Sequence, residues 1–78
     1  MSRKLPALTA ADLLRALRRA GFTVERIKGS HHHLRHAERP TLRVVVPVHR
    51  GDLPAGTVAA VLRQAGMGSD ELLELLRR

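Results

Sequence analysis

The middle third of the chain most constrains the fold, because it contains three short strand-like segments joined by two tight turns. Phe22–Lys28 mixes β-branched and charged residues, which favours a strand. Gly29-Ser30 supplies a two-residue turn, and His31–His36 forms a weaker strand that ends at a second turn, Ala37–Pro40. Thr41–Val46 is the clearest strand in the chain. Turns this short join antiparallel neighbours, so the sequence predicts a three-stranded antiparallel meander.

Helices are predicted on both sides of this meander in the chain. A capping box formed by Thr9 and Asp12 begins a helix over Ala10–Ala20. A second helix lies between Pro54 and Gly66, and a short third helix begins at Ser69. The order α-β-β-β-α, plus a terminal helix, defines an α+β class in which the helices cover one sheet face and leave the other open. The chain, residues 1–78, is expected to be a single domain.

The charge of the chain indicates an anionic partner. Lys and Arg number 14 against 7 Asp and Glu, for a formal charge of +7. This excess favours nucleic acid or an acidic protein as the partner, with simple solvation of helix faces as the alternative. Without cysteine, neither a disulfide framework nor a thiolate metal site is possible. No apolar run approaches the roughly 20 residues of a membrane span, and no signal peptide is recognised, so a cytoplasmic protein is expected.

Three consecutive histidines follow the first turn and are candidates for chemistry. RNA carries its own nucleophile, the 2′-hydroxyl, so its cleavage needs a group that removes that proton and a group that protonates the leaving 5′-oxygen. Imidazole suits both steps because its unperturbed pKa, about 6.5, lies near neutrality. A histidine at the mouth of a turn on a basic chain therefore favours an RNA-cleaving site.

Strand alternation sets a competing interpretation. It puts His31 and His33 on one face of the sheet, and His32, Leu34 and His36 on the other. If Leu34 faces the core, His32 becomes a buried histidine with a satisfied hydrogen bond, unless a bulge near the turn changes the phase. Zinc bound by His31, His33 and His36 is a further alternative, disfavoured because adjacent strand residues diverge and no second ligand cluster exists.

Four motifs occur in an order and spacing that resemble a known family. They are Gly29-Ser30-His31-His32, Val46-Pro47-Val48-His49, Asp52-Leu53-Pro54-Ala55-Gly56-Thr57 and Gln64-Ala65-Gly66. On these residues the chain resembles the HicA family of toxins from bacterial and archaeal toxin–antitoxin pairs, from about Leu13 to Leu76. It departs from the family at His33, where an aliphatic or other residue is usual, and it lacks the aromatic residue often found just beyond the histidines.

The resemblance implies a fold similar to double-stranded-RNA-binding domains and an mRNA interferase that cleaves RNA without a metal or other cofactor. It also implies a HicB-type antitoxin that covers the site. The family's functional histidine follows a Gly-Ser-x pattern, which corresponds to His32, although His31 is not fully separated from it by sequence.

The candidate site follows from these residues. His32 is predicted to be the general acid or base, with His49 as a second candidate. Lys28 and the backbone amides of Gly29 and Ser30 are the groups nearest to a developing phosphorane charge.

The predicted RNA-binding residues also include the cations of the open sheet face that would follow a phosphate backbone, which are Arg26, Lys28, Arg35 and Arg43. His31, beside the turn, is a further predicted RNA-binding residue. Two other functions remain open: a non-catalytic RNA-binding module, and a protein-interaction domain whose basic face docks an acidic partner.

Overall fold

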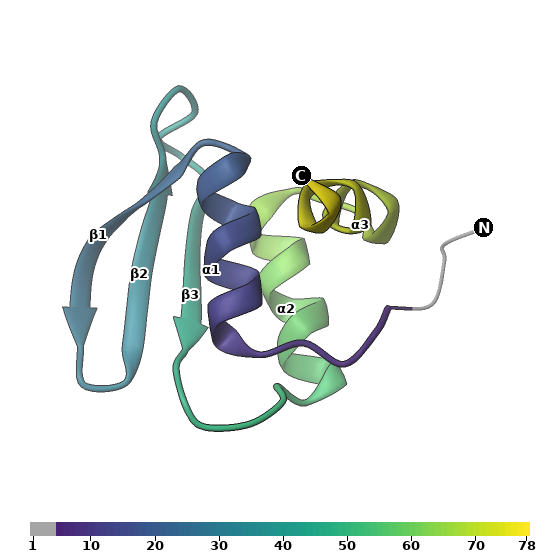
Figure 1. The fold of residues 1–78 in the computed structure, drawn as a ribbon. Coiled ribbons are helices and arrows are strands. Elements are labelled where there is room, and N and C mark those ends of the chain that lie inside the picture. Colours follow the sequence, from purple (N-terminus) through teal and green to yellow (C-terminus); the bar gives the residue numbers. More distant parts are fainter. Residues whose placement is uncertain (1–4) are drawn as a thin grey trace.

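The structure is a computed structural model that describes residues 5–78. Its elements are, in chain order, α1 (Ala10–Arg19), β1 (Phe22–Lys28), β2 (His31–His36), β3 (Arg43–Pro47), α2 (Ala55–Ala65) and α3 (Ser69–Arg77) (Figure 1). The predicted α+β class and the predicted order of elements are confirmed. The predicted domain also includes residues 1–4, which lie outside the described residues.

The sheet is the predicted antiparallel meander, with β2 between β1 and β3. The predicted bounds of β1 and β2 are those observed, but β3 begins at Arg43 rather than at Thr41. The two residues before it belong to a turn, in which the Leu42 N–H donates to the Arg39 carbonyl at 2.9 Å. Pro47 is the last residue of β3 rather than a stop before it, which an edge strand tolerates because one side of its ladder is unpaired.

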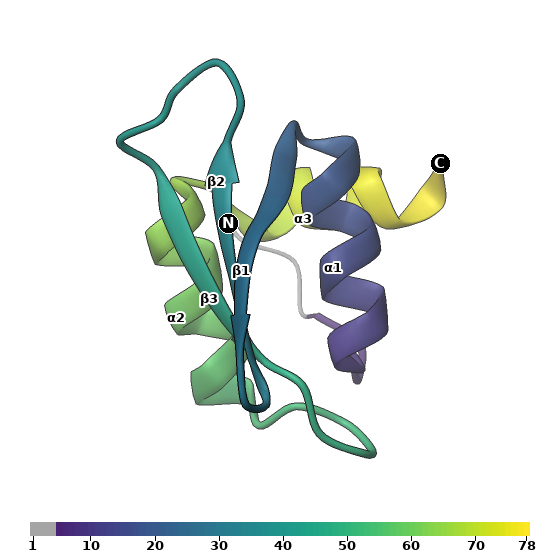
Figure 2. The same ribbon diagram turned by 90° about the vertical axis from the view of Figure 1, so that its left-hand side faces the viewer.

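The core lies between the sheet and the helices and is almost entirely aliphatic. In Figure 2, α1 lies beside β1 and α2 beside β3, while α3 packs against α1. The largest fully buried side chains come from α1, all three strands, α2 and α3, and they are Phe22, Leu13, Leu17, Leu34, Leu72, Val44, Val46 and Val61. Because the buried strand residues share one face, the predicted arrangement of one covered and one open face is confirmed.

Three side chains fix the two ends of α1. The predicted capping box is present: the Asp12 N–H donates to Thr9 Oγ1 at 3.2 Å, and the Thr9 N–H donates to Asp12 Oδ2 at 3.1 Å. The hydrogen bond from the Thr9 backbone, followed by that from its side chain, lowers the pKa of Asp12. At the other end of α1, Arg19 Nη1 donates to the Leu75 carbonyl at 2.8 Å and ties α1 to α3.

The outer edge of β3 is closed by a side chain from α2. The Val45 N–H donates to Gln64 Oε1 at 2.9 Å, so an amide that would otherwise face outward is paired. Gln64 belongs to the last of the four motifs, and this contact gives that motif a structural role. Among residues 5–78, no helix is long and apolar enough to cross a membrane.

Candidate active site

The cross-strand register decides which face each predicted site residue occupies. Ile27, His32 and Val46 are direct partners across the three strands, and Val46 is fully buried, so this row lies on the helix-covered face. The alternate rows place the predicted RNA-binding residues Arg26, Lys28, His31, Arg35 and Arg43 on the open face. The predicted catalytic histidine and the predicted RNA-binding cations therefore lie on opposite faces that meet at the β1–β2 hairpin.

A bulge is present, but in β1 rather than in β2. The register shifts between Val24 and Arg26, which leaves Glu25 as the extra residue. Val24 and Ile27 are three residues apart and would face opposite ways in a regular strand, so the bulge returns Ile27 to the helix-covered face. Since β2 is regular, His32 keeps the orientation that simple alternation predicts.

The bulged residue also pairs with a predicted RNA-binding cation. Arg35 Nη2 donates to Glu25 Oε1 at 3.2 Å. Arg35 Nε lies 2.7 Å from Glu25 Oε2, a close charge contact that is not aligned as a hydrogen bond. The charge of Arg35 is thus largely balanced by Glu25. The exposed cations Arg26, Lys28 and Arg43 provide the remaining positive charge of the open face.

His32 faces the helices without being sealed in the core. Its side chain is half-buried, and Nδ1 is inaccessible to solvent with no hydrogen-bond partner among the described residues. Nε2 has no hydrogen-bond partner among the described residues either, but it is not buried, so Nε2 is the nitrogen that solvent or a ligand can reach. A buried polar atom left unpaired costs about 1–3 kcal/mol, a cost that an aliphatic residue at this position would avoid.

The partial exposure of His32 follows from where the helices end. Along its row, Val46 is 0% exposed and Ile27 is 58% exposed, so cover falls from β3 towards the β1 edge. In Figure 1 the β1–β2 hairpin extends to the left of α1, away from the helices. The sequence conflict is therefore resolved by incomplete helix cover and not by a change of strand phase.

The hairpin turn brings a second predicted residue to the same end of the sheet. Gly29 has φ of 59° while Ser30 does not have a positive φ, the pattern of a type II′ turn with glycine first. The Ser30 carbonyl accepts the Val48 N–H at 2.7 Å, which holds the loop after β3 against the turn. His49 follows directly and is exposed. Among the described residues, no hydrogen bond joins His49 to His32.

His36, at the other end of β2, has a structural role. It is 6% exposed, and its Nδ1 accepts the N–H groups of Glu38 and Arg39, each at 3.1 Å. The ring proton must then lie on Nε2, which donates to the Ala20 carbonyl at 3.0 Å. The ring also meets Phe22 edge to face, with centroids 5.0 Å apart. The ring therefore holds two turns and a core aromatic in place.

The zinc alternative does not fit this arrangement. His31 and His33 lie on the open face, whereas His36 lies on the covered face with both ring nitrogens already bonded. Across residues 5–78, no group of three or more His, Asp or Glu side chains is placed to hold a metal ion.

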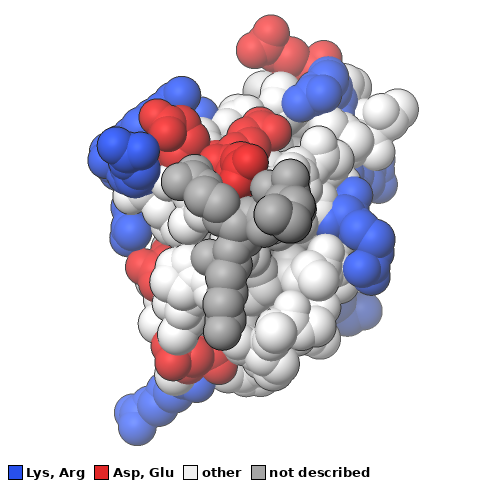
Figure 3. Space-filling model, turned by 90° about the vertical axis from the view of Figure 1, so that its right-hand side faces the viewer, with Lys and Arg blue, Asp and Glu red and all other residues white. Residues whose placement is uncertain are grey.

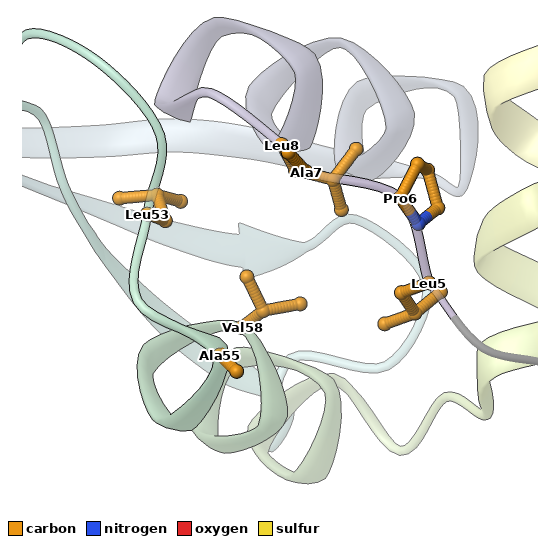
Figure 4. A pocket seen from close by; sticks show the side chains of 7 residues that line it. All are labelled: Leu5, Pro6, Ala7, Leu8, Leu53, Ala55 and Val58. Atoms are coloured by element: carbon orange, nitrogen blue, oxygen red, sulfur yellow. The ribbon is translucent and has the colours of Figure 1, made fainter.

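An apolar pocket of about 210 Å³ lies away from these residues (Figure 4). Its lining comes from the segment before α1, the loop before α2 and the start of α2, and consists of Leu5, Pro6, Ala7, Leu8, Leu53, Ala55 and Val58. None of these side chains has a group that can transfer a proton or bind phosphate, so the pocket has no part in the candidate chemistry.

Charge is mixed on the side of the molecule that carries α3 and the described start of the chain. Figure 3 shows acidic groups beside basic ones there, around a broad uncharged area. Three of the acids, Asp70, Glu71 and Glu74, belong to α3. On the sheet, by contrast, Glu25 is the single acid in the three strands, and it is paired. The net positive charge is therefore weighted towards the hairpin and the open face.

These features define a small basic α+β domain with an architecture like that of double-stranded-RNA-binding domains and an accessible imidazole beside its first hairpin. The chain belongs to the HicA toxin family: a family model described as the HicA toxin of bacterial toxin–antitoxin systems matches residues 10–67. No curated protein matches the chain significantly. Members of this family are toxins of toxin–antitoxin pairs and generally act as mRNA interferases, and membership implies an antitoxin partner.

Proposed function

We propose that this toxin is a metal-independent endoribonuclease that uses His32 as its general acid or base. The observation that carries the proposal is the His32 ring, which keeps Nε2 accessible while Nδ1 is buried and unpaired. Nδ1 of His32 makes no hydrogen bond that would stabilise the fold, yet a histidine occupies this half-buried position. Such local inconsistencies are expected at functional sites.

In the proposed reaction the 2′-oxygen forms a bond to phosphorus and the bond from phosphorus to the 5′-oxygen breaks. One imidazole accepts the 2′-hydroxyl proton and another supplies a proton to the 5′-oxygen, so His32 and His49 divide the two transfers. Lys28 and the amides of Gly29 and Ser30, at the intervening turn, stabilise the charge on the phosphorane.

The substrate path follows from the two faces of the hairpin. Phosphates held by Arg26, Lys28, His31 and Arg43 on the open face must pass round the turn to reach His32 on the other face. A single strand bends over this distance, whereas a stiff duplex does not. Binding through phosphates weakens as salt rises and selects little for base sequence.

The same geometry suggests how the toxin is silenced in the cytoplasm. A HicB-type antitoxin that covers the hairpin end blocks Nε2 of His32 and neutralises the cations of the turn. An acidic surface on the antitoxin matches the +7 charge of the toxin.

The test compares two adjacent histidines. Purified wild type is expected to cut RNA in excess chelator, and His32→Ala is expected to lose cleavage by roughly 10²- to 10⁴-fold while keeping its RNA affinity. His31→Ala, on the opposite face, is the matched control and should lower affinity more than turnover. Equal cleavage by wild type and His32→Ala would remove His32 from the mechanism, and loss of wild-type activity in chelator would contradict metal independence.

Two other outcomes correspond to the alternative functions. Salt-dependent RNA binding by the wild type, without cleavage of any RNA or arrest of growth, would indicate a non-catalytic RNA-binding module. Failure to bind RNA together with tight binding of an acidic protein partner would indicate a protein-interaction domain.

A further inference from the structure

Ile27 occupies an unusual position for its residue type. Ile27 is 58% exposed, and no other large hydrophobic residue among residues 5–78 is exposed. Single exposed apolar residues are common on protein surfaces and by themselves indicate nothing. This one, however, is placed on its face by the bulge at Glu25 rather than by the regular alternation of β1.

The neighbours of Ile27 connect it to the candidate site. Its direct cross-strand partner is His32, on the same face of the sheet. Directly opposite residues in an antiparallel pair have Cβ atoms roughly 5 Å apart, so a group bound at His32 Nε2 lies within reach of Ile27. Beyond Ile27 the sheet ends, and its chain neighbours Arg26 and Lys28 are exposed cations.

We infer that Ile27 is a substrate-positioning residue that forms an apolar shelf for one base of the RNA, beside the ribose whose proton His32 handles. The inference rests on the proposed nuclease function. Proteins that bind single strands usually stack bases on aromatic rings, but the single aromatic residue of this chain, Phe22, is buried. The branched aliphatic side chain of Ile27 packs against any base, while Arg26 and Lys28, on the open face of the same edge strand, attract the phosphates that lead to it.

The first test uses a short single-stranded RNA that the wild type cuts at one position. Ile27→Ala is expected to raise KM roughly three- to tenfold with kcat nearly unchanged, because apolar contact with the base is lost. Ile27→Phe is expected to lower KM roughly threefold, because a ring stacks better on a base. Ile27→Val should behave like the wild type. Leu73→Ala, which shortens a half-buried aliphatic side chain of α3, away from the sheet, is the matched control and should leave KM unchanged.

The second test determines whether the group that Ile27 contacts is a nucleobase of the RNA. Removing the base on one side of the cleaved bond, while keeping its ribose and phosphate, should raise KM as much as Ile27→Ala does. The combined change should then cost no more than either single change, since both remove the same contact. Additive losses at every position would show that Ile27 does not contact a base.

These outcomes separate the two proposals. If the wild type cleaves RNA and both Ile27→Ala and Ile27→Phe leave KM unchanged, the shelf is wrong and the nuclease function stands. If Ile27→Ala weakens only antitoxin binding, the side chain serves the protein interface and the inference is again overturned. If the wild type cleaves nothing, the function fails, and binding of an uncleavable 2′-deoxy strand to Ile27→Ala and Ile27→Phe still decides whether a base packs there.

Discussion

His32 and His36 lie on the same face of the same strand, four residues apart, but their rings differ in burial and in hydrogen bonding. Every polar atom of the His36 ring is hydrogen-bonded and the ring is buried between two turns. The His32 ring has one nitrogen buried without a partner and the other accessible. The two ends of β2 are thus organised differently. At one end the histidine bonds to two turns, and at the other end the histidine makes no hydrogen bond within the described residues.

The difference shows that a residue's face does not determine its role. Both rings point to the helix side, but the end of the sheet near His36 is closed by the α1–β1 turn, whose Ala20 carbonyl accepts a hydrogen bond from the ring. The hairpin end has no such closure. Substitutions at each end test this difference through the stability that each one costs.

The largest loss of stability is expected for His36→Ala, at about 3 kcal/mol, because it leaves a cavity beside Phe22 and unpairs three backbone groups. Thermal unfolding followed by circular dichroism should show a fall in Tm of roughly 12–24 °C. His32→Ala in the same assay should change Tm by less than about 4 °C. Similar losses from both variants would break the comparison.

Gly21→Ala should follow, with a loss of about 2 kcal/mol. Gly21 has φ of 107°, and an added Cβ would lie 2.8 Å from Nε2 of His36. Because the clash requires the ring, adding Gly21→Ala to His36→Ala should cost less than it does in the wild type. Urea unfolding of the four proteins measures this coupling, and strict additivity would contradict it.

Gln64→Ala should cost about 1 kcal/mol by unpairing the Val45 N–H at the sheet edge. Hydrogen exchange at the Val45 amide should accelerate, while the amides around His36 should keep their protection. Gln64→Glu, which retains an acceptor oxygen, is the control. Unchanged exchange at Val45 in Gln64→Ala would show that the amide is protected by other means.

The smallest effect is expected for Asp12→Asn, at about 0.5 kcal/mol, because Asp12 is partly exposed and caps α1 away from both histidines. The hydrogen bonds from Thr9 lower the pKa of Asp12 in the folded state. The carboxylate therefore stabilises the fold above its ordinary pKa, and this contribution is lost as the pH falls through the lowered native pKa. Denaturation at pH about 7 and about 2 should show the difference between the proteins disappear in acid. A persistent difference would assign it to something other than charge.

Much of the fold was predictable because its signals are local. Capping by Thr9 and Asp12, the Gly29-Ser30 turn and the alternation around Val44 each act over a few residues, and each was confirmed. The start of β3 was wrong by two residues, because a turn hydrogen bond holds Leu42 where β-branched neighbours favour a strand.

The site was less accessible to sequence reasoning because it depends on how far α1 reaches over the sheet. No local pattern encodes the partial cover of His32, the bulge at Glu25 or the partners of His36. The sequence marks Gln64 only as part of a motif, and nothing in it distinguishes Ile27 from the other residues of its strand. The roles of His32, His49 and the RNA-binding cations stay predictions until the variants are measured.

The two edges of the sheet determine how readily a second copy of the chain could pair with it. Exposed strand edges invite neighbouring copies to join and grow into aggregates. Here one border is occupied by the Gln64 amide and the other is kinked at Glu25 and flanked by positive charge. Both edges of the sheet are therefore poor templates for pairing with a second copy of the chain.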